Sequence, residues 1–193
     1  MQLFPTKKHL DLSGSFSDPE LKAFVGKCIA GDGRSQKTLY DLLAGRMFAV
    51  CLRYMGGRDE AEDVLQDGFV SLFLKLDTYS GEGSFEGWAR RIFVNTALMS
   101  LRRKDVLRES ADVDAAGNLP APDPGILQNI GYHDLLKLIA ELPNGFRTVF
   151  NMYVIEGYSH KEIAEALGVS ETTSRSQLLR ARALLQAKII EKN

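Results

Sequence analysis

The stretch Gly157-Tyr-Ser-His-Lys-Glu-Ile-Ala-Glu-Ala-Leu-Gly-Val-Ser170 decides the fold of the last quarter of the chain. Ser159, followed three residues later by Glu162, has the spacing of a capping box, so a helix is expected to start at Ser159. Gly168 stands where a tight turn needs a positive φ, which costs glycine almost nothing. Ser170 can then cap a second helix. The pattern predicts a helix-turn-helix.

The second helix has the residue order of a recognition helix in the DNA major groove. Its first turns carry short polar side chains that can reach base edges, and its later arginines can hold phosphates. An ordinary antiparallel helical hairpin is the alternative. The small residue Ala164, the turn glycine, the second cap and the basic helix together favour DNA binding.

Composition limits the other classes of function. Hydrophobic residues make up 45% of the 193 residues and charged residues 25%, as in an ordinary soluble globular protein. We expect no membrane insertion, because no run approaches the roughly 18 apolar residues of a membrane span. Cys28 and Cys51 lie in apolar surroundings and are expected to be buried thiols. A cytoplasmic protein without a metal or cofactor is the default expectation.

Charge is distributed unevenly along the chain. Residues 1–104 carry 15 basic and 13 acidic side chains, residues 105–133 carry 1 and 5, and residues 134–193 carry 8 and 7. The range 110–125 contains three prolines and two glycines and no basic residue. We therefore predict two small helical domains, 18–104 and 134–193, joined by a flexible acidic linker over 105–133.

The first domain is expected to be helical throughout, which makes the fold class all-α. The sequence Asp18-Pro19-Glu20 predicts a helix start, and the helix should run to Gly31. Further helices are expected over about 35–54, 59–76 and 85–104 from apolar residues at helical spacing. No alternating β-branched run is long enough to predict a sheet.

The third and fourth predicted helices differ in charge. Acidic residues gather at the start of the third, which suits the helix dipole and needs no partner. The fourth places arginines beside aromatic rings, as single-stranded nucleic acid binding requires, because bases stack on rings while cations hold the backbone. A place in the core is the equally weighted alternative for Trp88 and for Phe93.

Three segments carry a resemblance to a known family. Residues 59–69 resemble the core-binding helix of region two in bacterial sigma factors, and residues 83–95 resemble their promoter-melting segment. Residues 142–150, followed by 157–159, resemble the opening of region four. The order of these motifs and the size of the chain are similar to those of the extracytoplasmic-function (ECF) subfamily, over about residues 20–103 and 134–190.

The resemblance implies partners and site residues. Core RNA polymerase would be bound through the clamp of its largest subunit and through its flap, and an anti-sigma factor is a further implied partner. The positions that match the clamp-binding surface are Asp63, Gln66, Asp67 and Phe69. The positions that match the surface for −10 strand capture are Phe85, Trp88, Arg90, Arg91, Asn95, Arg102 and Arg103. Of these, Arg102 and Arg103 are expected to contact backbone phosphates where the helix leaves the site. Those that match −35 recognition are Ser170, Thr172, Thr173, Arg175, Ser176, Gln177 and Arg180.

Three positions depart from the pattern of the family. Ser174 replaces an apolar residue of the recognition helix, which indicates either that the helix packs slightly differently there or that serine is typical of one branch of the family. Gln177 stands where arginine is common, and Ser100 stands where an aspartate often precedes Leu-Arg-Arg. The acidic linker is either a spacer or, by its charge and position, a mimic of nucleic acid in the path of exiting RNA.

The sequence thus predicts a promoter-recognition subunit that is not an enzyme, because no nucleophile–base set, metal spacing or phosphate loop stands out. One alternative is a stand-alone regulator that binds duplex DNA tightly without polymerase. Another is an anti-sigma or adaptor protein whose second hairpin contacts protein. The arginines of the second helix argue against the adaptor, and salt-dependent DNA binding would exclude it.

Overall fold

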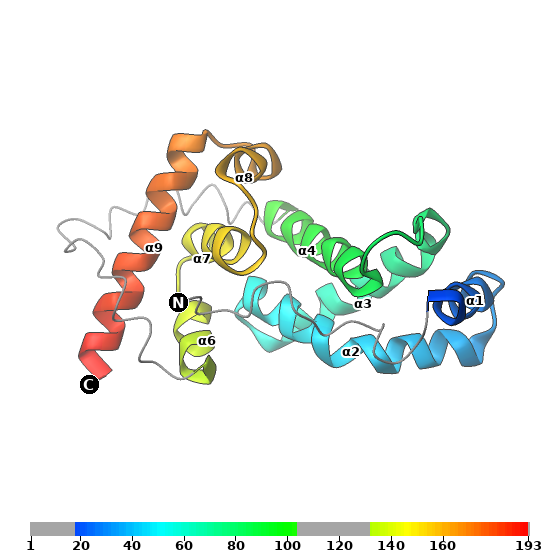
Figure 1. Cartoon of the computed structure of the whole chain (residues 1–193). Coiled ribbons are helices and arrows are strands. Elements are labelled where there is room, and N and C mark those ends of the chain that lie inside the picture. The colour runs from blue at the N-terminus through cyan, green and yellow to red at the C-terminus, as the bar shows by residue number, and fades with distance from the viewer. Residues whose placement is uncertain (1–17, 104–131, 193) are drawn as a thin grey trace. The chain divides into compact units, whose positions relative to one another are not determined.

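The computed structural model describes residues 18–103 and 132–192, which form helices and turns with no strand among them (Figure 1). The predicted all-α fold class is confirmed for this part of the chain. The described residues divide into two compact units: one contains 18–52 and 57–100, and the other contains 53–56, 101–103 and 132–192. Most of the predicted linker, up to residue 131, lies outside the described residues.

The first unit is built from helices whose bounds follow the predicted ones closely. They are α1 (Asp18–Ile29), α2 (Gly33–Met55), α3 (Arg58–Leu74), the 3-10 turn η2 (Leu76–Thr78) and α4 (Phe85–Arg103), of which the last residues of α2 and α4, from 53 and from 101, belong to the second unit. One difference is that the third helix ends at Leu74 and the 3-10 turn follows it. This turn packs against α1 and α3 before the chain enters α4.

Aromatic rings hold the core of the first unit together. The ring of Phe69 on α3 lies 4.4 Å from that of Tyr40 on α2 and 5.1 Å, edge to face, from that of Phe93 on α4. Gly68 lies under the Phe93 ring, which leaves no room for a larger side chain. Phe93 is fully buried, so the core alternative is confirmed for it.

Polar and thiol groups also lie inside the first unit. The Glu86 carboxylate, whose side chain is 4% exposed, accepts a hydrogen bond of 2.6 Å from Arg46 and so connects α4 with α2. Cys28 and Cys51 are buried free thiols, as expected. Burial, with a smaller contribution from the charge of Asp32, raises the pKa of the Cys28 thiol.

The second unit contains the helix-turn-helix. Its elements are α6 (Tyr132–Ala140), α7 (Asn144–Phe150), the π-helical segment η4 (Asn151–Ile155), α8 (His160–Leu167) and α9 (Glu171–Lys192). Both α7 and α8 pack along α9 (Figure 1). The Arg147 guanidinium donates to the carbonyls of Ala140 and Leu142, at 2.8 and 3.1 Å, and so closes the turn between α6 and α7.

Candidate nucleic-acid and polymerase interfaces

The start and end of α8 follow the sequence signals. The Ser159 hydroxyl accepts from the backbone N–H of Glu162 at 3.2 Å, and the Glu162 carboxylate accepts from the N–H of Ser159 at 2.8 Å. Gly168 ends the helix at φ 69°, and its N–H donates to the carbonyl of Ala164 at 2.9 Å. The predicted capping box and left-handed turn are confirmed, and together they fix the angle at which the chain enters α9.

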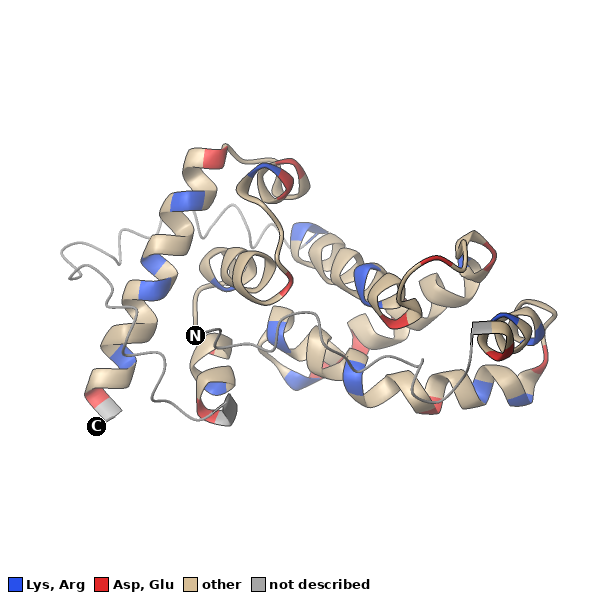
Figure 2. Ribbon diagram, in the orientation of Figure 1, with Lys and Arg blue, Asp and Glu red and all other residues tan. Residues whose placement is uncertain are grey.

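The beginning of α9 is held by its predicted cap. The Ser170 hydroxyl accepts from the backbone N–H of Thr173 at 3.0 Å, and the two side-chain oxygens lie 2.9 Å apart. Beyond this cap, one face of the helix exposes Thr172, Arg175 and Ser176. Basic residues recur along α9 below its acidic first residue (Figure 2). The sequence therefore places a short-polar and basic row on the outside of the helix-turn-helix.

Two residues of α9, Gln177 and Leu179, differ in exposure from what the sequence predicted. Gln177 is only 6% exposed, because its position on the helix turns it toward the core of the unit. Leu179 is instead 56% exposed and continues the outer row at helical spacing from Arg175 and Ser176. Leu179 was not among the predicted contacts, although its spacing from Arg175 could have indicated it.

The predicted −10 surface contains a cluster of three rings. The ring of Tyr79 lies 5.0 Å from that of Phe85 and 5.3 Å from that of Trp88, and the last two are 5.4 Å apart. Phe85 is fully buried, whereas Trp88 is half-buried. Phe85 therefore supports the cluster from inside, and Trp88 is the predicted −10 aromatic that reaches the surface.

Cationic and polar groups continue from these rings along α4. Arg91 and Asn95 are exposed, and Arg102 and Arg103 are exposed at the end of the helix, where positive charge also suits the helix dipole. Arg90 lies at the margin, with its guanidinium 4.0 Å from the buried Glu86 carboxylate.

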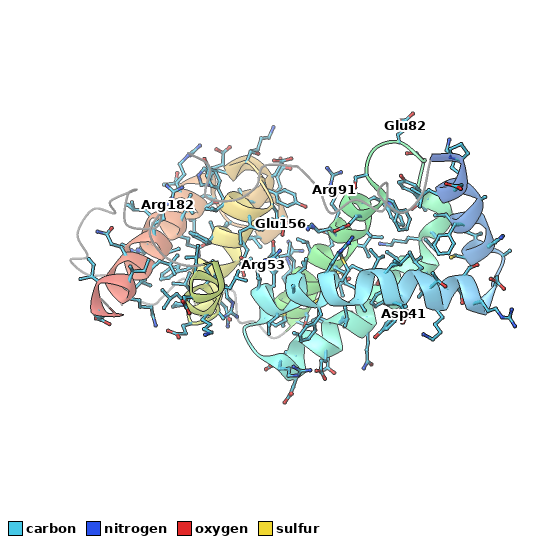
Figure 3. The ribbon with its side chains drawn as sticks, turned by 60° about the horizontal axis from the view of Figure 1, so that its bottom comes forward. Asp41, Arg53, Glu82, Arg91, Glu156 and Arg182 are labelled. Carbon is cyan, nitrogen blue, oxygen red and sulfur yellow. The ribbon has the colours of Figure 1, made fainter. Side chains whose placement is uncertain are left out.

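Figure 3 shows Arg91 on α4 and Glu82 on the loop that leads into this helix. Both side chains are exposed. An exposed negative charge thus stands on the loop before the basic helix α4 (Figure 3).

The predicted polymerase-binding helix presents a mixed surface. Asp63, Gln66 and Asp67 are exposed, but Phe69 is 4% exposed and belongs to the aromatic core. The same helix exposes apolar residues that were not predicted as contacts, and these are Val70 at 60% and Leu74 at 76%. An acidic and polar first half is thus followed by an apolar second half.

The imidazole of His160, the first residue of α8, contacts two other elements. Its Nδ1 lies 2.9 Å from the hydroxyl of Ser174 on α9, and its ring stacks on Tyr153 of η4 with centroids 4.4 Å apart and planes at 22°. Burial is the main cause that lowers the pKa of His160, and the positive charges of Arg175 and, to a smaller extent, Arg182 lower it further. The negative charge of Glu171 acts in the opposite direction. Ser174, the departure from the family pattern, is therefore a packed and hydrogen-bonded residue.

Neither metal-binding groups nor membrane-spanning helices are found in the described part of the chain. No three His, Cys, Asp or Glu side chains of residues 18–103 and 132–192 could hold a metal ion together. None of the described helices combines the length and apolar character needed to cross a bilayer.

Comparison with known proteins assigns both units to one family. The family model for sigma-70 region 2 matches residues 39–106, and the model for sigma-70 region 4 matches residues 132–185. The ECF RNA polymerase sigma factor SigE of Mycolicibacterium smegmatis is 35% identical over 149 residues, which are 74% of this chain and 57% of that protein. The ECF RNA polymerase sigma-E factor of Haemophilus influenzae is 28% identical over 179 residues, which are 87% of this chain and 94% of that protein.

Two solved structures also resemble the chain. One is the sigma factor RpoE of Bartonella quintana in complex with the anti-sigma factor NepR, with 22% identity, a TM-score of 0.48, and coverage of 80% of this chain and 96% of that one. The other is CnrH in complex with the cytosolic domain of CnrY, with 24% identity, a TM-score of 0.45, and coverage of 89% of this chain and 97% of that one.

The region 2 match covers most of the first unit and the region 4 match lies within the second, and together the two matches span more than half of the chain. The resemblance of the sequence motifs points to the same family, and named relatives share it over most of the chain. The chain belongs to the ECF subfamily of bacterial sigma factors, whose members are non-catalytic and direct RNA polymerase to promoters.

Proposed function

We propose that this sigma factor reads the −35 element as duplex DNA with α9 and holds one strand of the unwound −10 element on α4. One observation carries the −35 part: Thr172, Arg175 and Ser176 form an exposed row on a helix whose start is capped. Arg175 pairs with Glu171 at 2.7 Å, and both side chains are exposed. Such a surface pair is worth only about 0–1 kcal/mol, so Arg175 can exchange Glu171 for DNA.

The −10 part depends on capture and needs no chemistry. Extruding a base from the duplex costs a few kcal/mol, and stacking on an aromatic ring returns roughly 1–3 kcal/mol per base. Trp88 can supply that ring because Tyr79 and Phe85 support it from behind. Arg91 and Asn95 would contact the strand beside it, and Arg102 and Arg103 would hold phosphates further along α4.

Polymerase would be bound by the exposed surface of α3. Asp63, Gln66 and Asp67 supply its polar half, and we add Val70 and Leu74 as its apolar half because they follow at helical spacing and are exposed. We assign the domains as 18–104 for core binding and −10 capture, 105–133 as linker, and 134–193 for −35 recognition. An anti-sigma factor is the proposed inhibitory partner, and the cytoplasm, where polymerase and DNA lie, is the proposed location.

The test is transcription in vitro with purified core polymerase on fragmented genomic DNA of the source organism, with and without this protein. Discrete new transcripts downstream of a shared pair of motifs support the proposal and supply the promoter sequence. Absence of new transcripts, together with failure to co-elute with core enzyme on sizing, contradicts it. Tight duplex binding without polymerase in that case would favour a stand-alone regulator.

A further inference from the structure

A buried polar residue lies inside the recognition helix. Ser174 is 0% exposed, and it stands between Thr173, whose N–H is capped by Ser170, and the exposed Arg175. An apolar side chain at this position would contact its neighbours without a strong directional preference. A buried hydroxyl is favoured in an orientation that gives it a hydrogen-bond partner, because leaving it unpaired costs about 1–3 kcal/mol. Ser174 therefore specifies one orientation of α9 more narrowly than an apolar side chain would.

The partner of this hydroxyl is itself held in place. His160 Nδ1 lies 2.9 Å from the Ser174 oxygen, and the ring also stacks on Tyr153. Tyr153 comes from η4, where the π-helical geometry shifts side chains from their α-helical positions. One imidazole thus connects η4, α8 and α9. A bond from α8 to the inner face of α9 opposes rotation of α9 about its own axis.

We propose that the Tyr153–His160–Ser174 contact is a positioning device for −35 recognition, which orients the row Thr172, Arg175 and Ser176 toward the major groove. This inference rests on the proposed −35 function of α9. None of the three contact residues needs to touch DNA. Their effect is exerted through the angle and rotation of the helix, on which several base contacts depend together.

The contact is suited to the neutral imidazole. The charged groups that act on His160 are Arg175, Arg182 and Glu171 of α9, and Tyr153 of η4 covers one ring face. Neutral imidazole can either donate to the Ser174 hydroxyl or accept from it, whereas imidazolium can only donate. A proton on the ring would also add a cation beside two arginines. Protonation should therefore loosen the contact as pH falls.

The test uses reconstituted holoenzyme and a promoter found in the transcription experiment. Binding to this promoter is compared with binding to the same promoter with a scrambled −35 element, for the wild type, Ser174→Ala, His160→Ala and the double variant. Each single variant should lower the −35 discrimination about three- to ten-fold, the effect of one lost hydrogen bond. The double variant should lose no more than the larger single loss, because both changes remove the same contact.

A matched control separates orientation from stability. Thr148→Val removes a buried hydroxyl of the same unit that has no hydrogen-bond partner among the described residues. This variant should keep full −35 discrimination. All proteins are assayed at a temperature where thermal unfolding shows them to be folded and where they co-elute with core polymerase.

Acid pH provides an independent readout. Because the pKa of His160 is lowered, its ring is protonated below the ordinary histidine pKa of about 6.5. Wild-type discrimination should therefore fall as the pH is lowered from about 6.5 toward about 5, while a His160→Gln holoenzyme, which lacks the titrating ring, should change less over this range. Full discrimination in both single variants, additive losses in the double variant, or identical pH profiles of wild type and His160→Gln would overturn the inference. Because wild-type holoenzyme must first initiate at the promoter, a failure of the proposed function is seen before the variants are compared.

Discussion

At the scale of single residues, substitution by alanine should have opposite effects on the free energy of unfolding at two helical glycines. Gly68 of α3 faces the Phe93 ring, and a methyl group there would overlap with ring carbons. Gly45 of α2 is exposed and has open space beside it. Alanine favours a helix interior by about 1 kcal/mol over glycine at both positions.

We therefore expect Gly68→Ala to lower the free energy of unfolding by about 1–3 kcal/mol, because forced repacking outweighs helix propensity. Gly45→Ala should raise it by up to about 1 kcal/mol. Urea unfolding of the full chain measures both. A stabilised Gly68→Ala protein would show that the contact between α3 and α4 adapts more easily than the geometry indicates.

At the scale of elements, α8 depends on its two ends. Ser159→Ala removes the capping box and should cost about 1 kcal/mol. Gly168→Ala forces a non-glycine residue to φ 69° and should cost roughly 1–2 kcal/mol, although a methyl group meets no atom within 4 Å there. Differential scanning calorimetry should show both losses. A neutral Gly168→Ala would mean that the turn relaxes out of the left-handed region.

The start of α2 should respond to acid. Asp32 accepts from the backbone N–H of Ser35 at 2.9 Å and from its hydroxyl at 2.6 Å, and these hydrogen bonds lower the pKa of the Asp32 carboxyl. Because the folded pKa lies below the unfolded one, this stabilisation is present above the unfolded value and is lost as pH falls through the folded value.

We expect Asp32→Asn to reduce the dependence of the melting temperature on pH below about pH 4, the range in which an ordinary aspartate titrates. Wild type and variant should differ most at neutral pH and approach each other in acid. A constant difference across the range would mean that the charge of Asp32 does not contribute to capping.

The elements also show what could be read from the sequence. Ser159, Glu162, Gly168 and Ser170 act within a few residues of one another, so the helix ends were predictable from spacing alone. The burial of individual side chains was harder to predict, because it depends on packing between helices that are distant in the sequence. Phe69 turned out to lie against Phe93 and Tyr40.

The misplaced surface residues have the same cause. Helical periodicity groups residues into faces but does not say which face the neighbouring helices cover. Gln177 and Phe85 were therefore predicted as DNA contacts but are buried, while Leu179, which was not predicted as a contact, is exposed. The bond between His160 and Ser174 spans 14 residues and two helices, and no local pattern indicates it.

At the scale of the whole molecule, the two proposed interfaces lie on different units and should be separable by mutation. Asp67→Lys reverses an exposed charge on α3 and should weaken co-elution with core polymerase. Arg175→Ala should leave co-elution intact and weaken transcription from a −35-dependent promoter by about five-fold or more, since a bidentate base contact is worth roughly 1–3 kcal/mol. Loss of co-elution in the Arg175→Ala protein would contradict this division of labour.

The aromatic cluster before α4 has a practical consequence. Trp88 is the single tryptophan of the chain, and its half-buried indole contacts Tyr79 and Phe85. A base stacked on this indole should quench its fluorescence. Titrating the wild-type protein with −10 single strands, while its tryptophan emission is recorded, would therefore report strand capture without a label. The Trp88→Phe protein, which has no tryptophan, serves as the control. The chain thus carries its own optical probe at the place where the promoter is expected to open.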